Sequence, residues 1–236
     1  MDQANELRHV AVILDGHGRW AAQHGVERKE GHLAGANRVV DFLNYVKKYE
    51  SIRYVTLYAF STENWKRSKD EVDALMNILA RFLDDNLELL LKEKIRLLTT
   101  GDISALPEEC RVRLDKVKQK TEKDYTRTFI LALNYGSRME ITDAVKSIAA
   151  EVKNGTLSLG DIMEKTVAEH MYLPKVPDPD LLIRTSGEER VSNFLLWQIS
   201  YSEFYFTKTL WPDFDINEFD KAVQAFYGRK RRFGGR

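Results

Sequence analysis

The chain has 236 residues, of which 43% are hydrophobic, so it has the size of one α/β domain and can bury a substantial core. It carries 36 Lys and Arg against 36 Asp and Glu, and this formal net charge of zero gives no support for a nucleic-acid partner. A single cysteine, Cys110, excludes an intramolecular disulfide and indicates a reducing compartment.

The sequence shows no targeting or membrane-spanning segment. No stretch approaches the roughly 20 apolar residues of a membrane span, and the N-terminus, with Asp2 and Glu6, lacks the layout of a secretion signal. We therefore expect a cytoplasmic protein. The tail, residues 228–236, is basic and glycine-rich, so it either binds phosphates or anionic lipid headgroups or stays solvated.

The first apolar run, residues 10–14, predicts a strand buried on both faces that ends at Asp15. In open α/β sheets, ligands bind at the carboxyl ends of such strands. Gly16 and Gly18 let the backbone approach a ligand, and a helix that starts here points its amides at a phosphate. An ordinary strand and turn with an incidental carboxylate is the alternative.

Further β-rich runs alternate with helical patterns, which predicts an α/β fold with a central, mostly parallel six-stranded sheet flanked by helices. We take residues 1–236 as a single domain. The predicted strands are residues 10–14, 54–60, 95–99, 129–133, 181–184 and 204–207. Helical patterns cover residues 33–46, 68–91, 141–152, 162–167 and 217–226.

The helix at 68–91 is long and rich in large apolar side chains. It opens with Ser68, Lys69, Asp70 and Glu71, a pattern typical of a helix cap, and continues with a broad apolar stripe. The stripe indicates either core packing or the lining of an apolar tunnel.

Polar side chains gather where the predicted strands end. After the second strand, Ser61, Asn64 and Arg67 would bind an anion or orient an acid, or they would only cap a turn. After the strand at 181–184, Arg184 and Arg190 stand among three hydroxyl side chains. Guanidinium groups match phosphate oxygens, so this segment predicts a diphosphate site, with an ion-pair network as the alternative.

Glu203 is a carboxylate set among aromatic residues, and with Asp15 it could complete a Mg²⁺ site; a Glu paired with an arginine is the alternative. His32 would handle protons near the phosphate site, or it is structural. The sequence contains no zinc-ligand spacing, no G-x-x-x-x-G-K-[ST] phosphate loop, no G-x-S-x-G and no G-x-G-x-x-G motif. These absences argue against a zinc enzyme, a P-loop NTPase, an esterase and a dinucleotide dehydrogenase.

Taken together, these segments resemble the cis-prenyltransferase family over almost the whole chain. The resemblance implies a magnesium-dependent homodimer that adds isopentenyl diphosphate units to an allylic primer such as farnesyl diphosphate. The product would be a long-chain polyprenyl diphosphate, such as undecaprenyl diphosphate for the cell-wall lipid carrier. The blocks that carry it are residues 9–21, 31–32, 60–65, 134–136, 184–193, 204–206 and 210–212.

The resemblance also implies roles for single residues. Asp15 would assist Mg²⁺ and the departing diphosphate, and Glu203 matches the second acidic position associated with the metal. The residues implied near the reacting carbons are His32, Ser61 and Asn64. The residues implied in substrate binding are Gly16, His17, Gly18, Arg19, Trp20, Arg28, His32, Ser61, Glu63, Trp65, Arg67, Arg184, Arg190 and Ser192.

The chain departs from the family pattern at His17, where the family generally has asparagine, and at Ser137, a frequent glycine. We expect slower turnover, or stronger pH dependence, than in a His17→Asn variant. A lipid product implies contact with the inner face of the membrane at its surface. The rival interpretation is a non-catalytic subunit of the same fold that binds prenyl lipids.

Overall fold

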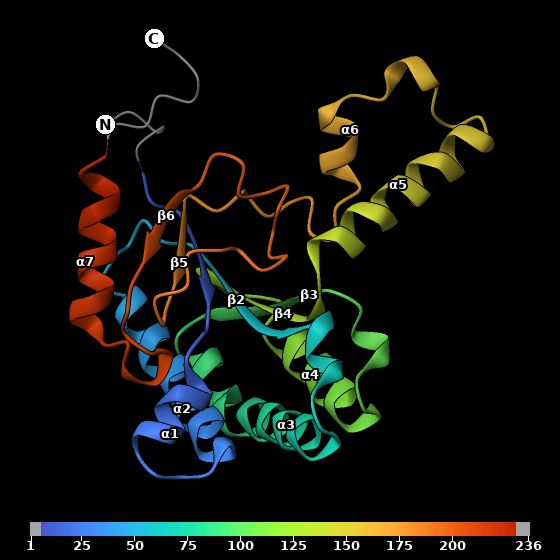
Figure 1. Cartoon of the computed structure of the whole chain (residues 1–236). Coiled ribbons are helices and arrows are strands. Elements are labelled where there is room, and N and C mark those ends of the chain that lie inside the picture. Colours follow the sequence, from blue (N-terminus) through green and yellow to red (C-terminus); the bar gives the residue numbers. More distant parts are fainter. Residues whose placement is uncertain (1–5, 230–236) are drawn as a thin grey trace.

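The structure, a computed structural model, describes residues 6–229 and is built on a six-stranded sheet (Figure 1). The strand order is β3-β4-β2-β1-β5-β6, and every neighbouring pair is parallel, which confirms the predicted α/β fold. The strands are β1 (His9–Ile13), β2 (Tyr54–Ser61), β3 (Ile95–Thr100), β4 (Arg127–Tyr135), β5 (Leu181–Arg184) and β6 (Glu203–Phe206).

Helices cover the sheet unevenly. Three of them, α2, α3 and α4, lie together below the sheet in Figure 1, whereas α5 and α6 extend away from it at the upper right. The helices are α1 (His17–Gln23), α2 (Arg28–Val46), α3 (Lys69–Lys92), α4 (Glu108–Lys120), α5 (Ser137–Lys153), α6 (Glu164–Glu169) and α7 (Ile216–Tyr227).

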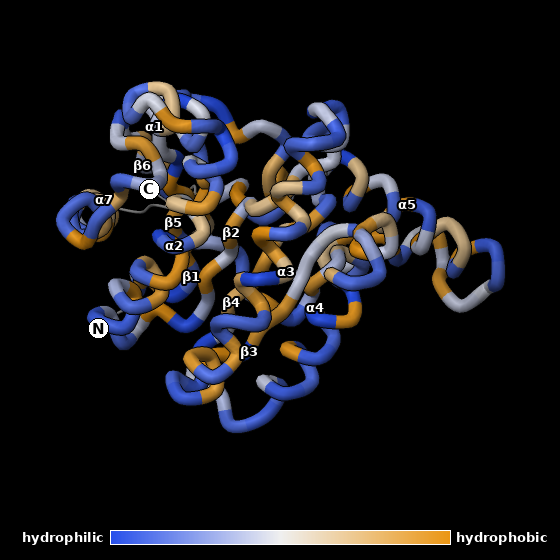
Figure 2. The backbone as a smooth tube through the Cα atoms, turned by 90° about the horizontal axis from the view of Figure 1, so that it is seen from below, coloured by the Kyte–Doolittle hydropathy of each residue, from blue (hydrophilic) through white to orange (hydrophobic). Residues whose placement is uncertain are grey.

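The alternation of side chains along the strands divides the core into two layers. From β1, Val10 and Val12 join the larger apolar cluster that also holds the buried faces of α2, α3, α4 and α7. Ala11 and Ile13 point to the other face, where they join a smaller cluster formed with loop residues after β5. Figure 2 shows apolar segments, coloured orange, in the centre of the molecule.

The connections give the sheet a switch point at β1. From β1 the chain moves to β2 on one side, and it returns much later as β5 on the other side. In such sheets the crevice at the carboxyl ends of the strands is the usual ligand site. The segments that follow β1, β2 and β5 therefore meet at one edge. Across residues 6–229, no helix has the length and apolar character needed to cross a bilayer.

Candidate functional site

The loop after β1 is fixed by its own backbone. Gly16 has φ +113°, a conformation that favours glycine, and a Cβ there would lie 2.9 Å from the Leu210 side chain. The Asp15 amide donates to Thr185 Oγ1 at 2.9 Å, and the Thr185 hydroxyl donates to the Asp15 carbonyl at 2.7 Å. The Asp15 carboxylate is thus held at the carboxyl edge of the sheet.

Arg184, the last residue of β5, binds this carboxylate. Its side chain is only 5% exposed, and it donates to Asp15 Oδ2 at 2.9 Å, to Ser192 Oγ at 2.8 Å and to the Arg190 carbonyl. Burial raises the pKa of Asp15, but the hydrogen bond and the charge of Arg184 outweigh it and hold the pKa below its usual value. Asp15 is therefore an ionised carboxylate at neutral pH.

Two further cations lie at the same edge and face solvent. Arg19 donates to the Ser186 carbonyl at 2.7 Å, and its guanidinium lies 3.7 Å from Asp15 Oδ1. Arg190 is more than half exposed and pairs with Glu188, which also lies 3.6 Å from Arg19. The segment after β5 thus forms the ion-pair network that was the alternative, and the Arg190 guanidinium within it stays exposed. That the segment binds a diphosphate stays a prediction.

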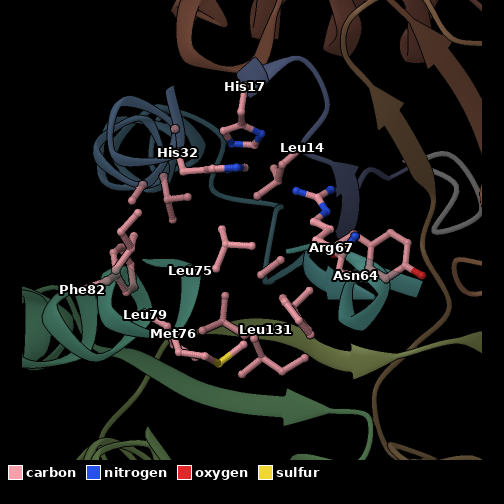
Figure 3. A pocket seen from close by; sticks show the side chains of 18 residues that line it. Leu14, His17, His32, Asn64, Arg67, Leu75, Met76, Leu79, Phe82 and Leu131 are labelled. Carbon is pink, nitrogen blue, oxygen red and sulfur yellow. The ribbon is translucent and has the colours of Figure 1, made fainter. Parts of the chain in front are cut away.

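A cavity of about 160 Å³ opens beside this edge, between α2, α3 and the strands β2 and β4 (Figure 3). His17, His32, Asn64 and Arg67 supply its polar part. The α3 stripe divides between the two predicted roles, because Leu83 and Leu90 are buried in the core while other residues of α3 line the cavity. Its apolar lining includes Leu14, Val39, Phe60, Leu75, Met76, Ile78, Leu79, Phe82, Leu131 and Leu133.

The two histidines of the cavity pack against each other, with ring centroids 5.1 Å apart. The His17 ring lies directly over Gly35, where a Cβ would come within 2.2 Å of Nε2. Burial lowers the pKa of His17 to about 3, and burial also lowers the pKa of His32. Burial thus favours the neutral form of the His17 imidazole, and its effect on turnover stays a prediction.

Glu71 contacts two of the residues that line this cavity, His32 and Arg67, although its sequence pattern predicts only a helix cap. Its carboxylate is 12% exposed and accepts hydrogen bonds from Arg67 at 2.6 Å, Arg28 at 3.0 Å and His32 at 3.3 Å. Burial raises the pKa of Glu71, but Arg67 and the other cationic partners hold it below its usual value. Because Glu71 fits a helix-capping pattern, no further signal in the sequence indicated that it lies at the site.

The polar segment after β2 forms a short turn of 3₁₀-helix, Thr62–Lys66, with the predicted cap. The Ser61 amide donates to Asn64 Oδ1 at 2.9 Å, and Asn64 also lines the cavity. Glu63 accepts from Asn193 at 3.1 Å, and the Trp65 indole donates to Asn134 at 2.8 Å. These contacts join the segment after β2 to the end of β4 and to the segment after β5.

Two other expected residues lie differently. The Trp20 indole donates to Asp213 at 2.8 Å and stacks on His24, and it is not among the residues that line the cavity. Gly18 lies under Arg28, because a Cβ there would come within 3.0 Å of the Arg28 guanidinium. Arg28 therefore reaches the glycine loop as well as Glu71.

The prediction that Asp15 and Glu203 share one Mg²⁺ ion is wrong within a single chain. Glu203 begins β6 opposite Leu181, at the amino edge of the sheet, whereas Asp15 follows β1 beyond the carboxyl edge. A strand rises about 3.3 Å per residue, so several residues along the strand direction separate the two carboxylates. Glu203 instead pairs with Arg229 at 2.7 Å, which is the alternative weighed for it.

Among the described residues, no group of three or more His, Cys, Asp or Glu side chains could hold a metal ion alone. Asp15 nevertheless fits Mg²⁺, because this ion commonly binds one or two carboxylates together with water and substrate phosphate oxygens. Only one oxygen of Asp15, Oδ2, takes the Arg184 hydrogen bond, and the other faces Arg19 at 3.7 Å. Asp15 therefore offers a single carboxylate, and a Mg²⁺ ion bound there would take its other ligands from water and from an anionic substrate.

Solved structures with the same architecture cover nearly all of the chain. The structure of lavandulyl diphosphate synthase from Lavandula x intermedia, in complex with dimethylallyl diphosphate, has a TM-score of 0.94 and 38% identity, and the match covers 99% of this chain and 100% of that one. A probable undecaprenyl diphosphate synthase from Campylobacter jejuni has a TM-score of 0.80 and 36% identity, with 98% and 99% covered.

The sequence comparisons agree. The family model described as "Putative undecaprenyl diphosphate synthase" matches residues 13–234. An isoprenyl transferase of Thermotoga maritima is 46% identical over 97% of this chain and 97% of its own length. A ditrans,polycis-undecaprenyl-diphosphate synthase ((2E,6E)-farnesyl-diphosphate specific) of Micrococcus luteus is 44% identical over 97% of this chain and 91% of its own length. The chain therefore belongs to the undecaprenyl diphosphate synthase family of prenyltransferases.

Proposed function

We propose that this chain is a cis-prenyl chain elongase, which condenses isopentenyl diphosphate units onto an allylic diphosphate primer such as farnesyl diphosphate. The observation that carries the proposal is the junction of two environments: the charged loop that holds Asp15 lies beside a cavity lined mainly by apolar side chains, because Leu14 and His17, on either side of Asp15 and Gly16, line that cavity. A substrate with a diphosphate head and a hydrocarbon tail has the same two parts.

The allylic diphosphate would bind at the loop after β1. The amides of Gly16 to Arg19 open a helix there, and the Arg19 and Arg28 guanidinium groups lie beside them. As the diphosphate leaves, negative charge builds up on its oxygens, and preorganised cations and amides stabilise that charge. The allylic carbon becomes electron-poor at the same time, beside the polar groups of His32 and Asn64.

The isopentenyl diphosphate would bind at the segment after β5. Arg190 and Ser192 face this site, and Arg184 fixes both by its contacts to the Arg190 carbonyl and the Ser192 hydroxyl. Guanidinium groups stay charged at any working pH, so the site keeps its affinity for a diphosphate. Glu188 pairs with Arg190 and Arg19, and a bound diphosphate would replace these contacts.

Asp15 would hold Mg²⁺ together with the oxygens of the allylic diphosphate. When bound, Mg²⁺ neutralises charge on the diphosphate and so helps it to leave. Arg184 keeps the Asp15 carboxylate ionised and oriented for this role. Glu203 has no part in this ion within one chain.

The cavity would receive the hydrocarbon and exclude water from the electron-poor carbon. An engineered cavity of about 150 Å³ binds benzene, so a cavity of 160 Å³ suits only the first part of a polyprenyl tail. A long product therefore requires α3 to give way as the chain grows. Phe82 of α3 lines the cavity, and its ring centroid lies 6.3 Å from that of Phe129. We therefore expect Phe82 to limit the length of the growing chain.

We also propose a homodimer. Support comes from β6, an edge strand that pairs with β5 alone in the described sheet, and from the exposed side chain of Tyr201, two residues before β6. The cytoplasmic location, the contact with the inner face of the membrane through the lipid product, and the single domain over residues 1–236 stay predictions. The basic tail lies almost entirely outside the described residues.

The proposal is tested with purified protein, Mg²⁺, farnesyl diphosphate and labelled isopentenyl diphosphate, followed by sizing of the products. We expect long-chain polyprenyl diphosphates, no product when EDTA removes the metal, and no product with Asp15→Asn. A folded wild-type chain that binds prenyl diphosphates but extends none of them would refute elongation and favour the lipid-binding subunit.

A further inference from the structure

Glu71 occupies a helix-capping position at the start of α3, but its side chain does not form the capping contact. It lies at the third position of α3, and its amide donates to the Ser68 side chain at 3.3 Å, as the capping pattern predicts. In a capping box the glutamate side chain would return to the backbone of Ser68. Here it turns away from its own helix, toward Arg28 and His32 in α2.

The partners of this carboxylate come from two elements that the cavity separates. Arg28 and His32 belong to α2, while Arg67 precedes α3, and all three donate to the same two oxygens. Two of them, His32 and Arg67, line the cavity, and Arg28 also covers Gly18 in the loop after Asp15. Glu71 therefore links the diphosphate loop, the cavity and the start of α3.

The guanidinium groups that bind Glu71 can exchange its carboxylate for another anion. The Arg28 side chain is 65% exposed, so it has room to rotate from Glu71 toward an anion at the glycine loop. His32 and Glu71 are largely buried, so they have less room to move. An incoming diphosphate would compete with the Glu71 carboxylate for Arg28 and Arg67, since both are anions that match a guanidinium.

We propose that Glu71 is a positioning residue of the diphosphate site: it holds Arg28, Arg67 and His32 between the glycine loop and the cavity, and it takes the place of a diphosphate's negative charge until one binds. This role presupposes the diphosphate chemistry proposed above. It predicts that loss of the charge has opposite effects on two measurements. Anions bind more tightly because a competitor is gone, whereas turnover falls because the three groups are no longer held.

The test compares the wild type with Glu71→Gln, using inorganic pyrophosphate as the binding probe in calorimetry and elongation as the second readout. We expect pyrophosphate to bind about fivefold more tightly, the size of one exposed ion pair of about 1 kcal/mol. We expect kcat to fall about tenfold or more, because small displacements of positioning groups are costly. Asp70→Asn, an exposed carboxylate in the same turn, is the matched control and should change neither value.

A damaged fold would lower both readouts, which separates it from the expected opposite changes; thermal unfolding of each variant checks this directly. Glu71→Asp keeps the charge and should keep the wild-type affinity for pyrophosphate. Unchanged or weaker pyrophosphate binding by Glu71→Gln, or unchanged turnover, would overturn the proposal. If the wild type itself does not elongate, the proposed function fails, and the pyrophosphate measurement alone then decides the role of Glu71.

Discussion

Replacement of Asp15 should cost stability as well as activity, because its carboxylate is the acidic partner of a buried arginine. Arg184 is 5% exposed and lies 2.9 Å from Asp15 Oδ2. Two unit charges about 4 Å apart attract by about 4 kcal/mol at an effective dielectric constant of about 20. Removal of one partner of a buried pair typically costs about 3 to 5 kcal/mol.

The expected loss is smaller than that range for two reasons. The Asp15 side chain is 30% exposed, and Arg184 keeps its hydrogen bonds to Ser192 and to the Arg190 carbonyl. We therefore expect Asp15→Ala to lower the free energy of unfolding by about 2 to 3 kcal/mol. Asp15→Asn retains an oxygen that accepts from Arg184, so it should lose only about 1 kcal/mol.

Urea unfolding measures these values, provided that the slopes with denaturant agree between variants. The double variant Asp15→Ala with Arg184→Met should lose less than the sum of its single variants, because the buried charge is then gone too. A broken buried pair costs about 3 kcal/mol, so a free energy of unfolding for Asp15→Ala within about 0.5 kcal/mol of the wild-type value would refute this reasoning. The sequence alone places Asp15 at a strand end and does not show that its partner there is buried.

Three further changes test other parts of the account. Burial lowers the pKa of His9 to about 4, so the unfolded chain takes up a proton that the folded chain does not; stability should fall by about 3 kcal/mol as the pH drops from 6.5 to 4. Urea unfolding at a series of pH values should show a smaller loss of stability for His9→Gln than for the wild type. An equal loss in the two proteins would contradict the argument that burial lowers the pKa of His9. His17→Asn should raise turnover about two- to tenfold, as expected for one repositioned hydrogen bond of about 0.5 to 1.5 kcal/mol; equal rates would remove the idea. Phe82→Leu should shift the products toward longer chains in mass spectrometry, and an unchanged distribution would show that Phe82 does not limit the cavity.

The strands and the polar segments at their ends could be predicted from the sequence because apolar runs and turn residues are local signals. The run at 181–184 coincides with β5, and Arg184 ends it as predicted. Parallel strands bring such ends to one edge, so the meeting of Asp15 with Arg184 followed from the fold class.

Register and side-chain direction could not be predicted in this way. Glu203 was expected beside Asp15, but a strand pattern does not say which end of the strand faces the site. Glu71 matched a helix cap, and only the packing of α2 against α3 shows that its side chain turns elsewhere. The burial of Arg184 likewise depends on the loop that follows β5, whose path no local pattern encodes.

The central claim is that a diphosphate is bound at the edge of the sheet while its hydrocarbon enters the cavity beneath. A crystal structure of the protein with Mg²⁺ and an unreactive farnesyl diphosphate analogue tests it most directly. We expect the diphosphate within hydrogen-bond distance of the loop from Gly16 to Arg19, and the hydrocarbon between α2 and α3 against Leu75 and Leu79. A headgroup bound elsewhere, or a hydrocarbon that lies outside the cavity, would contradict the account.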